Sequence, residues 1–321
     1  MWRITELMDD AKCFALVREA RWPDGVRCPH CQATTVVKNG RDPAHPGQQH
    51  YRCRACRRYF DDLTGTILSD RRHPLARWLA CLYLLVLNVS GAQIAQEIGV
   101  DGEEAHRMCT ALRDTVLAWQ MARPVTLCGE VEVDEVYLVA GHKGYPGIVE
   151  AEGRDGRDRK LRGERGRGTL EKERPPVLGL VERGGGLVVR LLPDVRQVTL
   201  EPVVTALVVP GTPVYTDEFV SYARLADLGY PHQTVCHAAG EYARDADGDG
   251  VCEVHVNTIE GIWALLRLWL RPHRGISQEK LPSYLAFFEA VYNCHQRGAY
   301  ALQPMLHILL TEEPASVPCG G

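Results

Sequence analysis

Two classes of side chain in this sequence could do chemistry: carboxylates and paired cysteines. Asp134 lies in "LCGEVEVDEVYLV", Asp217 lies in "TPVYTDEF", and Glu260 lies in "HVNTIEGIWALLR". Phosphodiester transfer needs no covalent protein nucleophile; two divalent ions can activate the attacking oxygen and stabilise the leaving oxygen. Mg²⁺ and Mn²⁺ prefer carboxylate ligands. The three acids are therefore a candidate two-metal site if the fold brings them together.

The segment that carries Asp134 is predicted to be a strand. Residues 127–139 alternate, with valines on one face and Glu130, Glu132 and Asp134 on the other. A solvated outer face explains Glu130 and Glu132. Asp134 is followed by Glu135 and a return to apolar residues, which makes it the candidate for chemistry.

The segments that follow predict a mixed sheet. Residues 177–183 and 187–192 form two strands joined by a glycine turn, so three strands follow one another. "TLEPVVTALVV" is then expected to be a helix, "TPVYTDEF" a strand that ends at Asp217, "SYARLADLGY" a helix and "HQTVCH" a final strand. A hairpin, a third strand and then alternating helices and strands predict an α/β domain, and Asp134 and Asp217 both stand on its sheet.

The helix expected from Asn257 to Leu270 has a narrow polar stripe. Asn257, Glu260, Ala264 and Arg267 share one face by their spacing of three and four residues, and the remainder is mostly apolar. Such a stripe favours a cleft over bulk solvent. Asn257 and Glu260 are both candidates for the third metal ligand, and we favour Glu260 because only a carboxylate adds negative charge to hold two dications.

Four cysteines have the spacing of a zinc site. "CPHC" holds Cys28 and Cys31, "CRAC" holds Cys53 and Cys56, and 21 residues separate the two pairs. Each pair can present two thiolates to one tetrahedral ion, and the intervening residues suit a β-hairpin. Four cysteines leave no open coordination position, so the predicted Zn²⁺ is structural. The other eight cysteines are scattered and read as small buried residues or idle thiols.

A helical region follows from about residue 73 to residue 120. "HPLARWLACLYLLVL" predicts one apolar helix, Ser90 and Gln93 open a second that closes at Gly99, and Asp101 and Glu104 open a third. Two capped helices around a glycine turn resemble a helix-turn-helix, whose last helix would read the major groove. A plain three-helix packing unit explains the same pattern and stays open.

Composition fits a globular, non-secreted protein. The chain has 321 residues, 45% hydrophobic and 24% charged, and no apolar run of bilayer length or signal peptide is visible, so we expect a cytoplasmic, nucleoid-associated bacterial protein that does not bind membranes. The net charge of −4 hides an asymmetry, because residues 1–80 hold 14 Lys and Arg against 9 Asp and Glu. A DNA-contacting front end would profit from that excess. Residues 151–174 are highly charged and read as a loop.

The motifs in their order resemble the DDE transposases of the bacterial insertion-sequence family 1595. The resemblance rests on "CPHC…CRAC", "YFDDLTGTIL", "VEVDEVYLVAGHKG", "VYTDEF…Y" and "HVNTIEGIWALLR", and it covers nearly the whole chain. It implies a zinc ribbon, a helix-turn-helix region and a ribonuclease H-like domain that cuts and joins DNA with Mg²⁺ or Mn²⁺. By motif, Asp134, Asp217 and Glu260 match the three acids of that family. Asn257 matches the position of an alternative third ligand, and Arg267 stands where related enzymes often have Lys.

The resemblance also sets the expected organisation and partners. We expect a zinc ribbon over residues 1–72, a helical DNA-binding region over 73–124 and a catalytic domain over 125–310, a multidomain α/β architecture. The expected partner is double-stranded DNA, both the terminal inverted repeats of a transposon and the target, bound by a homodimer or higher oligomer. The competing hypothesis is a regulator that keeps the zinc ribbon and helix-turn-helix but has lost the chemistry. His237 and His255 are expected to flank the active-site entrance; a second metal cluster with Cys236 and Cys252 is the alternative.

Overall fold

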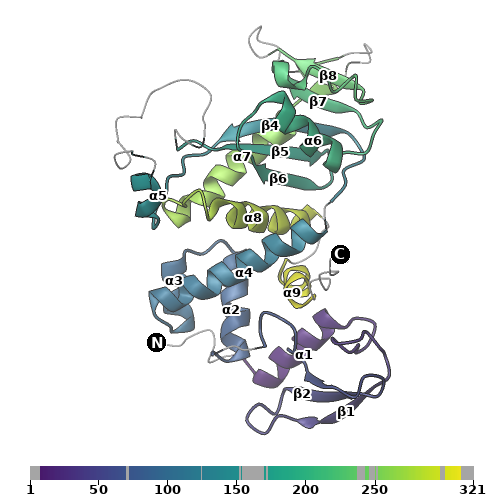
Figure 1. Cartoon of the computed structure of the whole chain (residues 1–321), viewed down its shortest axis with the longest axis vertical. Coiled ribbons are helices and arrows are strands. Elements are labelled where there is room, and N and C mark those ends of the chain that lie inside the picture. The colour runs from purple at the N-terminus through teal and green to yellow at the C-terminus, as the bar shows by residue number, and fades with distance from the viewer. Residues whose placement is uncertain are drawn as a thin grey trace. The chain divides into compact units, whose positions relative to one another are not determined.

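The computed structural model divides into two compact units, residues 1–123 with 297–321 and residues 124–296 (Figure 1). It describes residues 8–69, 72–123, 125–151, 153, 170, 173–236, 243–245, 250, 252–296 and 301–311. Most of the charged loop expected at 151–174, and His237, lie outside the described residues. A multidomain α/β architecture with a mixed sheet is confirmed, and each unit is described below by itself.

The first unit begins with helix α1 (Asp10–Arg21), which has Asp9 as its N-cap. A three-stranded antiparallel sheet follows in the order β1-β2-β3, with β1 at Val36–Arg41, β2 at Gln49–Cys53 and β3 at Tyr59–Asp61. Its small core holds Cys28, Tyr51, Cys53 and Phe60. So small a core is marginal by itself, because little apolar surface is removed from water.

Four helices complete the first unit: α2 (Leu75–Val86), α3 (Gly91–Ile98), α4 (Gly102–Ala122) and α9 (Leu302–Leu310). Ser90 caps α3, Asp101 caps α4, and α3 ends at Gly99 in the left-handed conformation, as the sequence predicts. Helix α9 contacts α1, α2 and α4. It therefore groups with the first unit, although the sequence analysis assigned its residues to the end of the catalytic domain.

The second unit is built on a five-stranded mixed sheet in the order β6-β5-β4-β7-β8. The strands are β4 (Val131–Tyr137), β5 (Pro176–Glu182), β6 (Leu187–Leu191), β7 (Val214–Asp217) and β8 (His232–Val235). Strands β4, β5 and β6 pair antiparallel, whereas β7 pairs parallel with β4 and β8. This is the ribonuclease H-like mixed sheet that the resemblance implied.

Helices cover both faces of this sheet. Helix α6 (Gln197–Leu207) shares a buried core with Val131 and Val133 of β4, joined by Tyr222 of the short 3-10 helix at Val220–Tyr222. The opposite face is covered by α7 (Asn257–Leu270), which contacts β4 and β5. Helix α8 (Leu281–Gln296) protects the edge strand β6, since Glu289 accepts from the Val189 N–H and Asn293 from the Leu187 N–H. Two short strands, β9 (Ala243–Arg244) and β10 (Val254–His255), precede α7, and α5 (Pro146–Ala151) follows β4.

Two expectations from sequence differ from the structure. "SYARLADLGY" forms the 3-10 helix at Val220–Tyr222 and turns where an α-helix was expected. Tyr222 and Leu225 are both buried, and a spacing of three residues suits a 3-10 turn. Glu132 is fully buried where a solvated face was expected, because α7 covers that side of β4.

None of the helices in the described ranges combines the length and the apolar character that spanning a membrane requires.

Candidate active site

Two of the predicted acids come from neighbouring parallel strands. Strands β4 and β7 pair with Val131 opposite Val214 and Glu132 opposite Tyr215. Continued by two residues, this register places Asp134 level with Asp217. Because successive side chains of a strand alternate between faces, partners at the same level of parallel strands point to the same face. The sheet therefore presents both carboxylates side by side.

The third predicted acid reaches the same place from α7. Trp263, one turn after Glu260, donates its indole N–H to Asp134 Oδ2 at 2.8 Å. Gly179 of β5 permits this approach, since a Cβ there would lie 2.3 Å from the Trp263 ring. Burial, with smaller contributions from the negative charges of Asp217 and Glu260, raises the pKa of Asp134 to about 6, although the Trp263 hydrogen bond acts to lower it. Asp217 on β7 and Glu260 on α7 thus both act electrostatically on Asp134 of β4.

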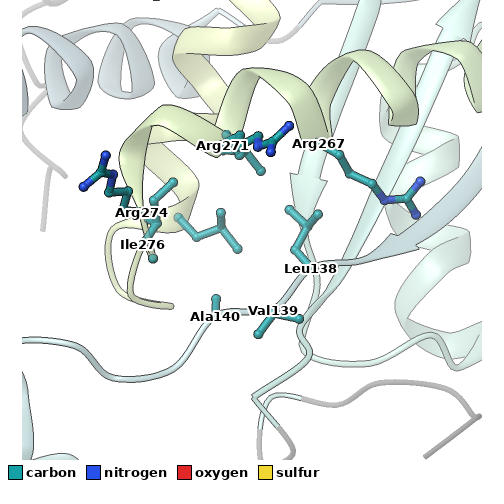
Figure 2. Close-up of a pocket in the computed structure, with 10 residues that line it drawn as sticks. Leu138, Val139, Ala140, Arg267, Arg271, Arg274 and Ile276 are labelled. Atoms are coloured by element: carbon teal, nitrogen blue, oxygen red, sulfur yellow. The ribbon is translucent and has the colours of Figure 1, made fainter. Parts of the chain in front are cut away.

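The helix stripe lies as predicted from its spacing. Asn257, Glu260, Ala264 and Arg267 are all exposed on α7, whereas Ile259, Ile262, Trp263 and Leu266 are buried. The backbone N–H of Asn257 donates to Nδ1 of His255 at 3.4 Å. Glu260, in contrast, interacts electrostatically with Asp134. Arg267 is seven residues further on and lines a pocket beyond the acids (Figure 2).

Helix α7 is fastened to β4 by Glu132, a residue that sequence reasoning passed over. Its Oε2 accepts the Ile259 backbone N–H at 3.0 Å and its Oε1 accepts the Thr258 hydroxyl at 2.9 Å. A carboxylate at the first turn of a helix satisfies free N–H groups and complements the helix dipole. Glu132 therefore fixes the start of the helix that carries Glu260.

Arg183 extends this attachment. Its Nε donates to Glu132 at 2.8 Å, and its Nη atoms donate to the carbonyls of Glu253 at 2.7 Å and His255 at 2.9 Å. The guanidinium also lies 4.2 Å from the ring centroid of Tyr215. His255, expected to flank the entrance, has Nδ1 3.2 Å from Glu132 Oε1. The chain entering α7 is thus held by one buried ion pair.

A second tie lies on the other face of the sheet. Tyr222 is fully buried and donates its hydroxyl to Glu135 Oε1 at 2.7 Å. Burial raises the pKa of Tyr222 and the Glu135 carboxylate adds to this, so the phenol stays a donor. This bond joins the residue after Asp134 to the segment after Asp217.

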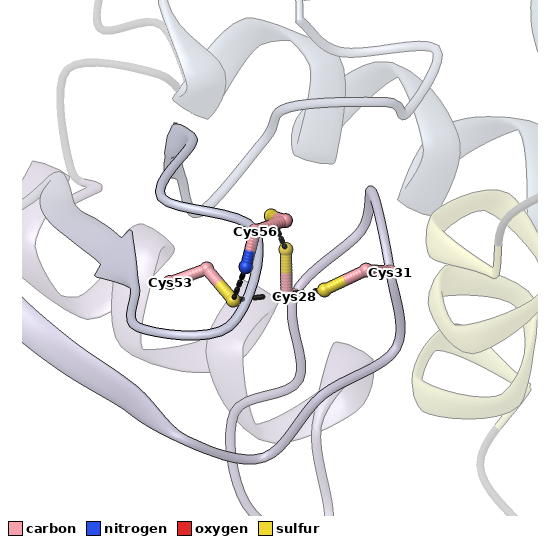
Figure 3. A group of neighbouring side chains, drawn as sticks. All are labelled: Cys28, Cys31, Cys53 and Cys56. Atoms are coloured by element: carbon pink, nitrogen blue, oxygen red, sulfur yellow. Dashed lines mark hydrogen bonds between the residues drawn. The ribbon is translucent and has the colours of Figure 1, made fainter.

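In the first unit, the four predicted cysteines converge. The sulfurs of Cys28, Cys31, Cys53 and Cys56 lie within 4.8 Å of one another, the one such group of three or more metal-ligating side chains in the described ranges (Figure 3). Two Sγ–Sγ distances are 3.6 Å. Tetrahedral zinc with bonds of about 2.3 Å needs sulfurs roughly 3.8 Å apart, so these cysteines fit a structural Zn²⁺.

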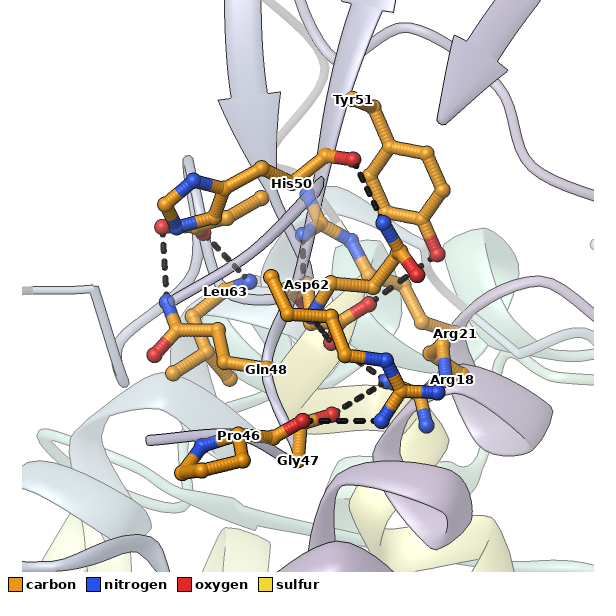
Figure 4. A network of polar contacts seen from close by, with 12 residues as sticks. Arg18, Arg21, Pro46, Gly47, Gln48, His50, Tyr51, Asp62 and Leu63 are labelled. Carbon is orange, nitrogen blue, oxygen red and sulfur yellow. Dashed lines mark hydrogen bonds and ion pairs between the residues drawn. The ribbon is translucent and has the colours of Figure 1, made fainter. Parts of the chain in front are cut away.

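The zinc-binding sheet is joined to α1 through buried Asp62 (Figure 4). Its carboxylate accepts from Arg18 Nη1 at 2.6 Å, from the Gln49 N–H at 2.7 Å and from the Tyr51 hydroxyl at 3.2 Å. Arg21 donates to the Asp62 carbonyl at 2.8 Å. Asp62 has no exposed surface, so these donors offset the cost of burying its charge.

Comparison with known proteins decides the family. The ISXO2-like transposase domain matches residues 126–293, and the transposase zinc-ribbon domain matches residues 8–59. A relative from Halobacterium salinarum, described as an uncharacterized protein in transposable element ISH50, is 33% identical over 326 residues, covering 97% of this chain and all of that protein. The chain belongs to the ISXO2-like transposases of insertion-sequence family 1595. The resemblance inferred from sequence is thereby confirmed.

The residues of this transposase that the sequence missed share one property. Glu132, Arg183 and Tyr222 act on the candidate site through other side chains. The available signal was the run of acids at the alternating positions 130, 132 and 134. Which of the three points into the fold depends on α7, more than 120 residues later.

Proposed function

We propose that this transposase hydrolyses a phosphodiester at each transposon end and joins the liberated 3′-hydroxyl to target DNA, with two divalent ions held by Asp134, Asp217 and Glu260. The observation that supports the proposal is that repulsion from Asp217 on β7 and from Glu260 on α7 adds to the effect of burial in raising the pKa of Asp134 on β4. Bound dications would relieve that repulsion. Hard carboxylate oxygens suit Mg²⁺ or Mn²⁺.

When bound, the two ions would supply activation of the attacking oxygen and stabilisation of the leaving oxygen. The chain's own residues fix the site. Trp263 holds Oδ2 of Asp134 in one orientation, Glu132 and Arg183 hold α7 against the sheet, and the Tyr222–Glu135 bond ties the two acid-bearing strands. Arg267 offers a permanently charged fork to a DNA phosphate.

In the first step water attacks phosphorus, and the bond between phosphorus and the 3′ oxygen of the sugar breaks. The departing 3′ oxygen takes a proton and becomes a 3′-hydroxyl. In the second step that hydroxyl loses its proton and attacks a target phosphorus, and a target 3′-hydroxyl leaves. Each step exchanges one phosphorus–oxygen bond for another. Neither step needs a redox partner.

For DNA binding we propose the first unit. Helices α3 and α4 meet at Gly99 as in a helix-turn-helix, with α4 in the position of the reading helix. Its partners would be the terminal inverted repeats and the target duplex, and its place of action the nucleoid. Because two ends must be paired, the working form would be a homodimer or higher oligomer.

The test uses labelled DNA that contains the inverted repeats flanking the gene, incubated with the full-length protein and Mg²⁺. We expect nicking and strand transfer by the wild type and by Asp227→Asn, which changes an exposed acid outside the site. Asp134→Asn should lose both activities by at least about a hundredfold, since it removes a proposed ligand while keeping volume. Equal products from Asp134→Asn and wild type would refute the proposal. Binding of the ends without cleavage by the wild type would favour the regulator.

A further inference from the structure

A pocket in the second unit lies where β4 leaves the sheet and α7 ends. It has a volume of about 280 Å³. Apolar side chains form much of its lining, among them Leu138, Ala140 and Leu281, and three arginines line it from α7 and the loop that follows, Arg267, Arg271 and Arg274 (Figure 2). Figure 2 shows the guanidinium groups of Arg267 and Arg274 pointing away from the middle of the pocket on opposite sides, so the arginine heads form a rim. The interior is apolar and the rim is cationic.

The charge on this rim is not neutralised by the described residues. Other arginines of the same unit have carboxylate partners, as Arg183 has Glu132 and Arg190 has Glu289. Over the described ranges no carboxylate forms an ion pair with the three rim arginines. Three exposed cations within two helical turns repel one another unless an anion is bound.

The walls of the pocket are fixed. Gln278 is buried, and its Nε2 donates to the Ala140 carbonyl at 2.9 Å while its N–H donates to the Gly141 carbonyl at 2.8 Å. Arg274 ends the short 3-10 helix Arg271–His273 in the left-handed conformation, with φ 48°. The two hydrogen bonds from Gln278 therefore hold the Ala140 wall of the pocket in place.

The pocket continues from the acids along two elements. Arg267 is seven residues beyond Glu260, roughly 10 Å along the helix. Leu138 is four residues beyond Asp134, roughly 13 Å along an extended strand. These lengths correspond to about three to four steps of 3.4 Å in B-form DNA. A strand whose phosphate lies at the acids would pass the pocket within a few nucleotides.

We propose that this pocket binds one unstacked nucleotide of the DNA strand a few positions from the phosphate at the acids, with its base on the apolar lining and its flanking phosphates on the rim arginines. A single nucleotide has the required apolar body and anionic edge, whereas a stacked duplex offers no single base to so small a pocket. One guanidinium group can donate two parallel hydrogen bonds to two oxygens of the same phosphate. The proposal rests on the proposed function and names the substrate feature that the site recognises.

The experiment is photo-cross-linking of the full-length protein, without divalent metal, to a 20-nucleotide thymidine strand that carries 5-iodouracil. Cross-linked residues are identified by mass spectrometry. We expect cross-links within residues 138–140 or 270–281. Arg271→Ala with Arg274→Ala should lower their yield at least about tenfold, since two charge-assisted contacts are lost. The matched control, Arg196→Ala with Arg224→Ala, removes two exposed arginines of the same unit that have acidic neighbours and should change nothing.

Two comparisons separate the base from the phosphates. Val139 lies at the half-exposed edge of the lining, and Val139→Ser should weaken cross-linking of the thymidine strand. An abasic strand has the phosphates but no bases, so its ability to compete with the thymidine strand should be the same for Val139→Ser and the wild type. Polyglutamate should compete poorly. Cross-links confined to other segments, a yield indifferent to both arginines, or equal competition by polyglutamate would overturn the proposal.

The outcomes distinguish this proposal from the proposed function. Cross-linking in the pocket by a protein that cleaves no end DNA would leave the pocket standing and sink the catalytic proposal. Metal-dependent cleavage with no cross-link in these segments would do the reverse.

Discussion

At position 260 a carboxylate stands one helical turn from the amide of Asn257, and both are exposed. Their charge distinguishes the two candidate ligands, because the negative charge of Glu260 adds to the effect of burial in raising the pKa of Asp134. We expect Glu260→Gln to abolish strand transfer and Asn257→Ala only to weaken it, about tenfold or less, since an amide adds no negative charge for two dications. The measurement is joining of a precut 3′ end to plasmid DNA. The opposite order of the two variants would assign the third ligand to Asn257.

Asp134 predicts how stability depends on pH in protein without added Mg²⁺. Its folded pKa of about 6 exceeds the ordinary value of 3.8, so the folded state binds the proton more tightly. Its contribution to stability is present below pH 4 and is lost as pH rises through 6. With 1.36 kcal/mol per pKa unit, the loss is about 3 kcal/mol.

Asp134→Asn carries no titrating proton there. Its free energy of unfolding, measured by urea titration, should equal the wild-type value near pH 4 and exceed it by about 3 kcal/mol at pH 8. Saturating Mg²⁺ should shrink the difference by stabilising the wild type alone. Asp227→Asn supplies the control, with a difference that does not change with pH. A wild-type curve parallel to that of Asp134→Asn would contradict the raised pKa of the buried Asp134 carboxyl.

At this scale the sequence singles out the candidate acids but not the residues that hold them in place. Glu260 stands out on a mostly apolar helix, Asp217 stands out at the end of a predicted strand, and Asp134 stands out because the strand returns to apolar residues after Glu135. Glu132 has the same chemistry and the same strand, but its burial depends on a helix N-terminus 127 residues away. Local pattern contains no information on that contact.

Among the elements, α7 is attached to β4 through the buried Glu132 carboxylate. Glu132→Gln should destabilise the second unit by about 3 kcal/mol, because it leaves the Arg183 guanidinium partly buried without its buried partner. Glu130→Gln removes the second carboxylate that pairs with Arg183. Because the Glu130 side chain is half-exposed, this change should cost less than about 1 kcal/mol. Urea unfolding of both variants measures the difference. Equal costs would mean that burial at position 132 contributes nothing.

The three-stranded zinc sheet should depend on its ion in the same way. We expect one zinc per chain, and Cys53→Ser should lower that content to near zero and melt the sheet, since a core of four buried residues cannot compensate for lost metal bonds. The matched control is Cys252→Ser, an exposed cysteine of the second unit. Elemental analysis and thermal melting followed by circular dichroism check both. Full zinc content in Cys53→Ser would show that Cys53 is not a ligand.

The same elements show where pattern reasoning works. Caps and period placed α3, α4 and α7, because those signals are local. On α7, however, Leu265 and Leu268 are 47% and 62% exposed, so the exposed face is wider than its polar stripe. Periodicity therefore predicts which side of a helix is buried, but it does not predict which residues make up the exposed side.

For the whole molecule, the order of the predicted elements indicates the mixed sheet, but it does not indicate that the C-terminal helix belongs to the first unit. The spacing of apolar segments and turns predicts the hairpin and the later strands. The structure adds that β4 and β7 pair in parallel. Helix α9 joins the first unit although the second unit separates it from that unit in sequence. Such a return is a tertiary contact, and no local signal in residues 302–310 announces it.

The whole-molecule prediction is pairing of two DNA ends. Full-length protein mixed with end fragments of two different lengths should give a complex of intermediate mobility that holds one fragment of each length, because one protein dimer would grip two ends. Native gel electrophoresis with two fluorescent labels detects it. Only single-label complexes at every protein concentration would exclude an end-pairing oligomer under these conditions.

The Asp134–Trp263 hydrogen bond spans 129 residues of chain, which has a consequence for timing. At synthesis rates of roughly 5–20 residues per second, about 6 to 26 seconds separate the emergence of the two partners from the ribosome. Until the second arrives, the strand acids have neither their helix carboxylate nor their indole donor. On the proposed function, a chain terminated before α7 could therefore cut no DNA, and because α9 completes the first unit, such a chain should also bind the transposon ends more weakly than the finished enzyme does.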